Sequence, residues 1–120
     1  HTKRTKMQVI AWQNAEFSGE NVVVSVLAQN ESAKEIQILM PKNSQMKEHK
    51  APFDISVQLL RGELEFSVSS EKVVLKELDM VCLKANEPHS LRALQNSIVR
   101  LSLAQADSAK RVQGVLKRNP

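Results

Sequence analysis

Two histidines are the side chains of this 120-residue sequence best suited to chemistry. His49 stands at the head of an alternating apolar run, "EHKAPFDISVQLL", and His89 lies in "ANEPHSLRAL". Imidazole titrates near neutral pH, so a histidine can act as an acid or a base, form hydrogen bonds or bind a metal ion. A fold that brings the two rings together would therefore create a candidate site.

The elements that must position these histidines are predicted to be β-strands. Short runs that are β-branched or alternate in polarity extend from Met7 to about Leu103, and they recur about every 8–12 residues between turn residues. The runs are "MQVIAW", "NVVVSVLAQN", "KEIQILMP", "DISVQLL", "GELEFSV", "EKVVLKEL", "DMVCLKA", "HSLRAL" and "SIVRLSLA". This spacing, without a regular amphipathic helix, predicts an all-β fold, a jelly-roll barrel or similar closed double sheet.

Strand alternation predicts which side chains face the interior. Side chains alternate with period two, so a continuous strand from 49 to 59 would place one apolar set on the inner face. That set is His49, Ala51, Phe53, Ile55, Val57 and Leu59. Pro52 is the weak point, since proline suits only the edges or irregularities of a sheet.

Two connections between runs carry turn signals. "LLRGELEF" predicts a tight hairpin in which Gly62 adopts an unusual φ. "SVSSEKVV" predicts a second hairpin, with Ser69 and Ser70 near its tip. In the strand after Gly62, Leu64 and Phe66 are expected to point inward.

Charge is concentrated outside the predicted barrel. The net charge of +4 divides into +3 in residues 1–6, +3 in residues 107–120 and −2 in the body between them. With one Trp, three Phe and no Tyr, the body lacks the basic, aromatic face that nucleic-acid binding requires.

No apolar stretch reaches the ~18–20 residues of a membrane span, and Cys82 is the single cysteine. These features predict a cytoplasmic protein with no nucleic-acid or membrane partner.

The chain is predicted to form one domain. Residues 1–6 are interpreted as an added segment or a disordered leader, residues 7–104 as the barrel and residues 105–120 as a basic tail. Val112, Val115 and Leu116 have the spacing of a short amphipathic helix, which Gly114 weakens. A helix, an added strand and a disordered segment all remain open for the tail.

The stretches "MPKNSQMKEHKAPFDISVQLLRGELEFSV" and "ELDMVCLKANEPHSLRAL" resemble the two motifs of a small single-domain cupin. The resemblance covers roughly residues 35–104 and implies a double-stranded β-helix, or jelly-roll barrel. It implies that His49 and His89 stand at metal-ligand positions of the family and meet inside the barrel near its open end. It also implies a homodimer, in which Trp12 is a candidate for packing across the interface.

The sequence departs from the cupin motifs at several positions. Ala51 stands where the second histidine of the first motif belongs, and Ile55 stands where a Glu or Gln ligand belongs. Further replacements are Asn43, Leu78 and Asn86 for glycines, Lys84 for a proline and Ala93 for an asparagine. Two of the four usual metal ligands are therefore present, and the metal chemistry of the family does not carry over intact.

Three interpretations of the histidine pair remain open. In the first, His49 and His89 hold a divalent metal (Fe, Zn, Mn or Ni) in a dioxygenase- or isomerase-type enzyme with an incomplete ligand set, although such sites generally use at least three protein ligands. In the second, a metal-free pocket binds a small polar or anionic molecule. In the third, backbone groups or buried water satisfy both rings. A regulatory module that uses the basic tail is a weaker alternative.

The leading prediction is the small-molecule pocket, because apolar residues at two ligand positions favour the second and third interpretations over the first. The predicted pocket residues are His49, His89, Ala51, Phe53, Ile55, Val57, Met40 and Cys82.

Overall fold

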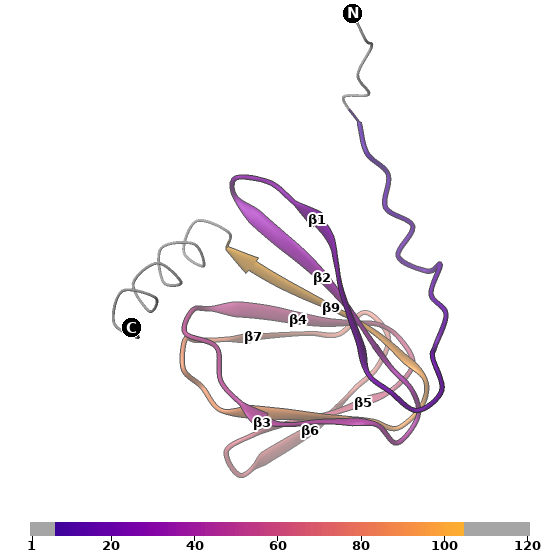
Figure 1. Cartoon of the computed structure of the whole chain (residues 1–120). Helices are drawn as coiled ribbons and strands as arrows, with labels where there is room; N and C mark the ends of the chain where they lie inside the picture. The colour runs from indigo at the N-terminus through magenta and orange to yellow at the C-terminus, as the bar shows by residue number, and fades with distance from the viewer. Residues whose placement is uncertain (1–6, 105–120) are drawn as a thin grey trace, which may run out of the picture.

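The computed structural model describes residues 7–104, which form nine β-strands and no helix (Figure 1). The strands are β1 (Val23–Gln29), β2 (Ala33–Met40), β3 (Gln45–His49), β4 (Ile55–Arg61), β5 (Leu64–Val68), β6 (Glu71–Leu75), β7 (Met80–Leu83), β8 (His89–Ala93) and β9 (Ser97–Ala104). The predicted all-β fold class is confirmed. The predictions for residues 1–6 and 105–120 lie outside the described residues.

The strands form two antiparallel sheets that face each other (Figure 1). The first sheet has the strand order β1-β2-β9-β4-β7, and the second has the order β3-β8-β5-β6. Strands that are neighbours in space are mostly distant in sequence, as in a jelly roll. The predicted double-sheet barrel is therefore confirmed.

The core fills the space between the two inner faces. In the first sheet, the register aligns Leu59 with Val99 and Val99 with Ile38, and all three side chains are buried. In the second sheet, Leu64 and Phe66 point inward and are almost wholly buried, as strand alternation predicts. Burial of apolar surface of this kind supplies the main favourable free energy of folding.

The prediction of a hairpin at Gly62 is wrong. β4 and β5 lie in different sheets, so this connection crosses from one sheet to the other. The unusual φ is present at +102°, and a side chain there would collide with the backbone of Asn96 and with Ser97. A hairpin and an inter-sheet crossover both need such a turn, and for this reason the local sequence does not distinguish them. The second predicted hairpin is confirmed, because β5 pairs with β6 across Ser69, whose φ is +55°.

The first apolar run, "MQVIAW", forms no strand, contrary to expectation. Residues 7–10 project away from the sheets (Figure 1), and Met7 and Val9 are 71% and 82% exposed. Trp12 instead anchors the segment to its own chain. Its carbonyl oxygen accepts a hydrogen bond of 3.2 Å from Gln37 Nε2, and the Arg100 guanidinium lies 5.7 Å from the indole centroid.

The predicted continuous strand from 49 to 59 is also wrong. β3 ends at His49, β4 begins at Ile55, and the two strands belong to opposite sheets. The link between them contains Pro52, which has no N–H to donate to a ladder. Strand phase therefore does not align residues 49–53 with β4.

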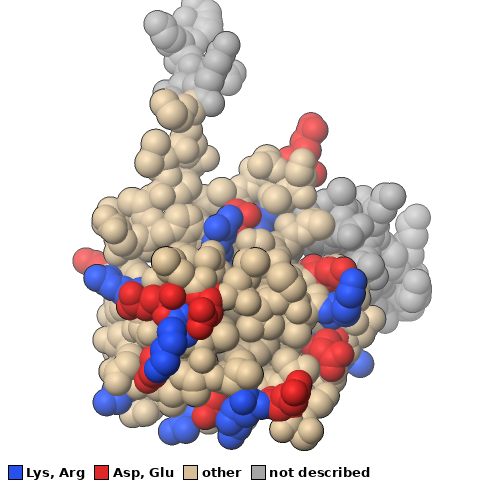
Figure 2. Space-filling model, turned by 180° about the vertical axis from the view of Figure 1, so that it is seen from behind, with Lys and Arg blue, Asp and Glu red and all other residues tan. Residues whose placement is uncertain are grey.

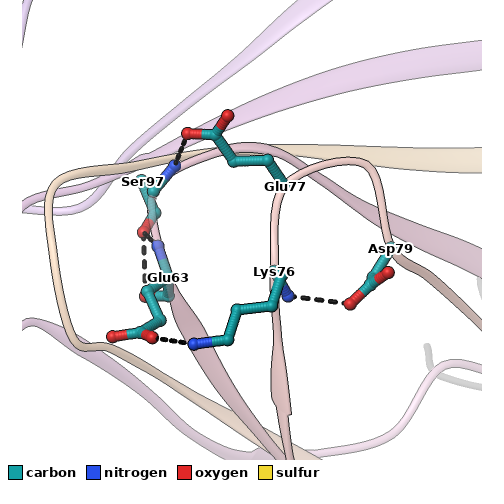
Figure 3. Close-up of polar contacts among 6 residues, drawn as sticks. Glu63, Lys76, Glu77, Asp79 and Ser97 are labelled. Atoms are coloured by element: carbon teal, nitrogen blue, oxygen red, sulfur yellow. Dashed lines mark hydrogen bonds and ion pairs between the residues drawn. The ribbon is translucent and has the colours of Figure 1, made fainter.

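A polar cluster closes one end of the barrel, where the β4–β5 crossover meets the β6–β7 turn and the start of β9 (Figure 3). The fully buried Ser97 Oγ accepts a hydrogen bond of 3.2 Å from the Glu63 N–H and lies 2.8 Å from the Gln95 carbonyl oxygen. Glu63 forms an ion pair with Lys76, and Glu77 accepts a hydrogen bond of 3.2 Å from the N–H of residue 62. We call this region the closed end.

The outer face of the first sheet carries a second polar cluster. Glu35 Oε1 accepts hydrogen bonds from Arg100 Nε at 2.9 Å and from Ser102 Oγ at 2.5 Å. Burial acts to raise the pKa of Glu35, but these hydrogen bonds and the charge of Arg100 outweigh it, so the pKa lies below its ordinary value.

Figure 2 shows that acidic and basic side chains are interspersed on the face drawn there, a pattern typical of a solvated surface.

Candidate functional site

Strand pairing brings the two histidines together. His49 is the last residue of β3 and His89 the first of β8, and the two are direct partners in the register of the second sheet. Their ring centroids lie 4.4 Å apart with the planes at 62°, an edge-to-face arrangement. His89 is buried, with 4% of its surface exposed, whereas His49 is exposed. This region, opposite to the closed end, is the histidine end.

Backbone carbonyl groups fix the protonation of both rings. His49 Nδ1 lies 2.7 Å from the Lys47 carbonyl oxygen, and His89 Nδ1 lies 2.9 Å from the Glu87 carbonyl oxygen. A carbonyl oxygen can only accept a hydrogen bond, so Nδ1 carries the proton in each ring. In a neutral imidazole, Nε2 is then the nitrogen with the lone pair.

Packing also fixes the orientation of His89. The ring of Phe66 in β5 stacks against it with a centroid separation of 5.7 Å and an interplanar angle of 5°. His89 is therefore held by an aromatic face, by the Glu87 carbonyl group and by the ring of His49. Such restraint is typical of a side chain that presents one atom in a defined direction.

A cavity of about 170 Å³ lies between the two sheets at the histidine end. Its lining residues are Ile38, Met46, His49, Ala51, Phe53, Ile55, Val57, His89, Leu91, Leu101 and Leu103. Among these residues of the described chain, the two histidines alone have polar side chains. The arrangement is an apolar chamber with two imidazoles at one wall.

Six of the predicted pocket residues lie around this cavity: His49, His89, Ala51, Phe53, Ile55 and Val57. Ala51 and Phe53 reach it from the β3–β4 link rather than from a strand. That link is held at its rim position by the Asn86 N–H, which donates to the Ala51 carbonyl oxygen at 2.6 Å, and by the Ala85 N–H, which donates to Asp54 Oδ1 at 2.8 Å.

Two predicted pocket residues, Met40 and Cys82, lie elsewhere. Met40 is fully buried but pairs with Ser97 in the register, which places it at the closed end. Cys82 lies on the outer face, with its Sγ atom 3.9 Å from Ser56 Oγ. Alternation along β7 explains this position, since Val81 packs against the core and its neighbour must point outward.

Five residues that line the cavity are not among the predicted pocket residues: Ile38, Met46, Leu91, Leu101 and Leu103. Apart from Met46, which lies in a polar stretch, their alternation within apolar runs marks them as inward-facing. Their place at the cavity depends on which strands pair and in what register, and no local signal carries that information.

Known proteins resemble this chain in structure. No family model matches the chain, and no curated protein matches it. A cupin superfamily protein from Desulfitobacterium hafniense superposes with a TM-score of 0.73 at 15% identity, over 84% of this chain and 93% of that one. An RmlC-like cupin from Desulfovibrio desulfuricans gives 0.70 at 17% identity, over 88% and 98%. A cupin 2 conserved barrel domain protein from Leptotrichia buccalis gives 0.68 at 25% identity, over 75% and 44%.

The chain has the cupin fold. At these identities the likeness concerns the fold, and the activity must be argued from the site itself. None of the described residues forms a helix of the length and apolar character that crossing a membrane requires.

The residues at the centre of this cupin fold do not fit a protein-held metal ion. The side chains of Ala51 and Ile55 offer no donor atom at the two positions where the family motif has ligands. Across residues 7–104, no three His, Cys, Asp or Glu side chains gather closely enough to hold a metal. Two imidazoles fall short of the three or more protein ligands that zinc or iron sites generally use.

Proposed function

We propose that this protein binds a small, largely apolar molecule in the cavity at the histidine end, with His49 and His89 as its polar contacts. Ligand sites are mostly apolar hollows with a few convergent polar groups, and this cavity has that composition. Its volume of about 170 Å³ is close to that of an engineered apolar cavity of ~150 Å³ that binds benzene. The expected ligand is therefore about the size of one aromatic ring with a substituent.

The observation that carries the proposal is the pair of fixed imidazoles on an apolar chamber. Across residues 7–104, neither Nε2 atom forms a hydrogen bond with another protein group. A buried polar atom without a partner costs on the order of 1–3 kcal/mol. A ligand that occupies the cavity and reaches Nε2 would remove that cost at His89.

A thermal-shift and NMR screen with small aromatic probes would test the proposal. The wild type should gain stability in the presence of a binding probe, by about 2.7 kcal/mol at a hundred times its Kd. Ala51→Leu should abolish the gain, because the larger side chain occupies the cavity. Ala33→Leu, on β2 away from the cavity lining, is the matched control and should keep it. Equal responses in the wild type and Ala51→Leu would refute the proposal.

A metal-dependent enzyme of the dioxygenase or isomerase type is the alternative. It is supported by the family positions of His49 and His89 and opposed by the missing donors at Ala51 and Ile55. Elemental analysis of protein purified without chelators or nickel resin would separate the two. Near-stoichiometric iron, zinc, manganese or nickel in the wild type, lost in His49→Ala, would favour the enzyme.

We further propose that the partner of the chain is a second copy, paired along β1. Within residues 7–104, four strands form sheet edges, and β1 is the longest of them that lacks a charged residue. Its Val24 and Val26 are 57% and 52% exposed. Long uncharged edges are prone to pair with another chain, and a two-fold pairing of one edge with itself gives a closed dimer.

Light scattering would test the homodimer. The wild type should have twice the mass of one chain, and Val26→Lys should shift it to one chain. Val73→Lys, on the opposite sheet's edge strand β6, is the matched control and should leave the mass unchanged. A wild type with the mass of a single chain would contradict the proposal. The cytoplasmic location, supported by the single cysteine, likewise remains a proposal.

A further inference from the structure

We infer that the ligand of the cavity carries a neutral hydrogen-bond donor, so that its class is a small phenol or apolar alcohol rather than a carboxylate or a phosphate. The inference rests on the proposed function, because it names the chemistry of a molecule bound at the same cavity.

The direction of the imidazole hydrogen bonds determines which atom each ring offers to a ligand. Both Nδ1 atoms donate to backbone carbonyl groups, at 2.7 Å for His49 and 2.9 Å for His89. Neutral rings held in this way offer only the lone pair of Nε2 to a ligand. The matching group on the ligand is a donor such as O–H.

The charge around the cavity disfavours an anionic ligand. Of the described residues that line it, none is acidic, and none is basic apart from the two imidazoles. On β3, Lys47 and Glu48 border a separate hollow on the outer face of the second sheet. At the rim, Asp54 forms an exposed ion pair with Lys84. An anion would therefore lose its hydration without gaining a fixed cation, which is costly in an apolar site.

Three further charged positions lie near the cavity in sequence or register. Lys50 stands between the lining residues His49 and Ala51, but its side chain is exposed and is not part of the lining. Lys34 pairs with Leu103 in the register of the first sheet but is not among the lining residues. Glu87 precedes β8 and contributes its carbonyl group to the His89 ring. None of the three supplies a positive side chain to the chamber, so the electrostatic character of the site is that of a hydrogen-bond acceptor.

The shape and surface of the chamber favour a ligand with one ring. Phe53, Leu91 and Leu101 provide apolar walls, and the volume of about 170 Å³ accommodates one ring. Aromatic rings favour edge-to-face and offset contacts with neighbouring rings. A phenol satisfies both requirements, because its ring fills the apolar space while its hydroxyl group donates to Nε2.

Three probes of similar shape test this inference: phenol, toluene and benzoate. The assay is run at pH 8.5, where a phenol keeps its proton and benzoate is ionised. Binding is followed by NMR shifts of the cavity methyl groups. Phenol should bind about fivefold more tightly than toluene, the ratio expected for one hydrogen bond of ~1 kcal/mol. Benzoate should bind more weakly than both.

Variants assign the preference to the imidazoles. His89→Leu should reduce the preference for phenol over toluene, because the buried acceptor is gone and only the exposed ring of His49 remains. His49→Leu, at the exposed ring, gives a second variant if the buried substitution prevents folding, and it should reduce the preference. Ser56→Ala, on the outer face, should keep the preference of the wild type. An unchanged preference in both histidine variants would overturn the inference.

The outcomes distinguish a failure of the proposed ligand class from a failure of the proposed pocket. Toluene binding as tightly as phenol, or benzoate binding most tightly, would overturn the donor class and leave the apolar pocket in place. No binding of any probe would overturn both. Nitrogen NMR of the imidazoles gives an independent reading: both rings should show a protonated Nδ1 and an unprotonated Nε2, and the reverse tautomer in both would overturn the inference.

Discussion

Polar groups at the closed end of the barrel pair with one another, whereas at the histidine end each ring leaves one nitrogen without a partner among the described residues. Ser97 Oγ is fully buried and has backbone partners on two connections. The ring of His89 is nearly as buried, but only its Nδ1 is bonded to protein. The first arrangement stabilises the fold, and the second leaves chemistry available to a ligand.

The difference shows how a barrel with two similar sheets comes to have two unlike ends. At the closed end, Gly62 brings the crossover so close to Ser97 that no space remains for a Cβ atom. At the histidine end, the β3–β4 link spans the two sheets and keeps a chamber between them. Substitutions should therefore affect stability at the closed end and binding at the histidine end.

The largest effect is expected for Gly62→Ala. The new Cβ would lie 2.8 Å from Ser97 Cα and closer still to neighbouring oxygen atoms, at a φ that L side chains rarely adopt. We expect a loss of about 2–4 kcal/mol in the free energy of unfolding, from the combined strain and crowding. Chemical denaturation measures it. Gly19→Ala, with a φ of +58° and open space around it, should cost much less; equal losses would show that crowding at the closed end is unimportant.

Ser97→Ala should have the next largest effect. The substitution removes the acceptor for the Glu63 N–H and leaves a buried donor without a partner. The expected loss is about 1–3 kcal/mol, measured in the same denaturation series. A loss within experimental error would mean that water replaces the hydroxyl group and that the closed end is not held as tightly as its contacts imply.

His89→Leu sharpens the comparison at the other end. Leucine keeps the burial and the apolar contact with Phe66, and it also removes a polar atom from an apolar chamber. The free energy of unfolding should change by less than about 1 kcal/mol, while the preference for phenol is reduced. A loss as large as that of Ser97→Ala would assign the imidazole a structural role instead.

The smallest effect is expected for Glu35→Gln, on the outer face. The lowered pKa of Glu35 means that its contribution to stability is present above the ordinary value of 4.5 and is lost as the pH falls below it. The partly exposed pair with Arg100 should be worth about 0.5 kcal/mol. The variant should be less stable than the wild type at pH 7, and the difference should shrink as the pH is lowered below 4.5. A difference that stays constant as the pH falls would exclude the ion pair as its cause.

Sequence alone predicted the strands better than their connections. Alternation placed Ile55, Val57 and Phe66 correctly on inner faces, because burial of one face leaves a period-two pattern. The sequence around Gly62 predicts a hairpin where the chain crosses between the sheets, since both connections need a residue with positive φ. The apolar residues of "MQVIAW" predict a strand, but this segment meets no partner strand in the described chain.

The candidate site was predictable in part, and for two different reasons. The resemblance to cupins brought His49 and His89 together, and strand pairing in the structure does the same. Ala51 and Phe53 do line the cavity, but they reach it from the link between the two sheets. The continuous strand from which their position was predicted is not present. Met40 and Cys82 were misplaced because distance along the barrel and the outward turn of β7 depend on register.

The position of β9 has a consequence for how the chain is made. β9 is the last barrel strand in chain order, yet it lies between β2 and β4 in the middle of the first sheet. Until the ribosome has released residues 97–104, that sheet exists at best as two separate parts with open edges. Pairing over such long sequence distances is slow, and open edges invite association with other chains. Productive folding of this barrel must therefore be a late event in synthesis, and a nascent chain stalled before β9 should be a substrate for chaperones.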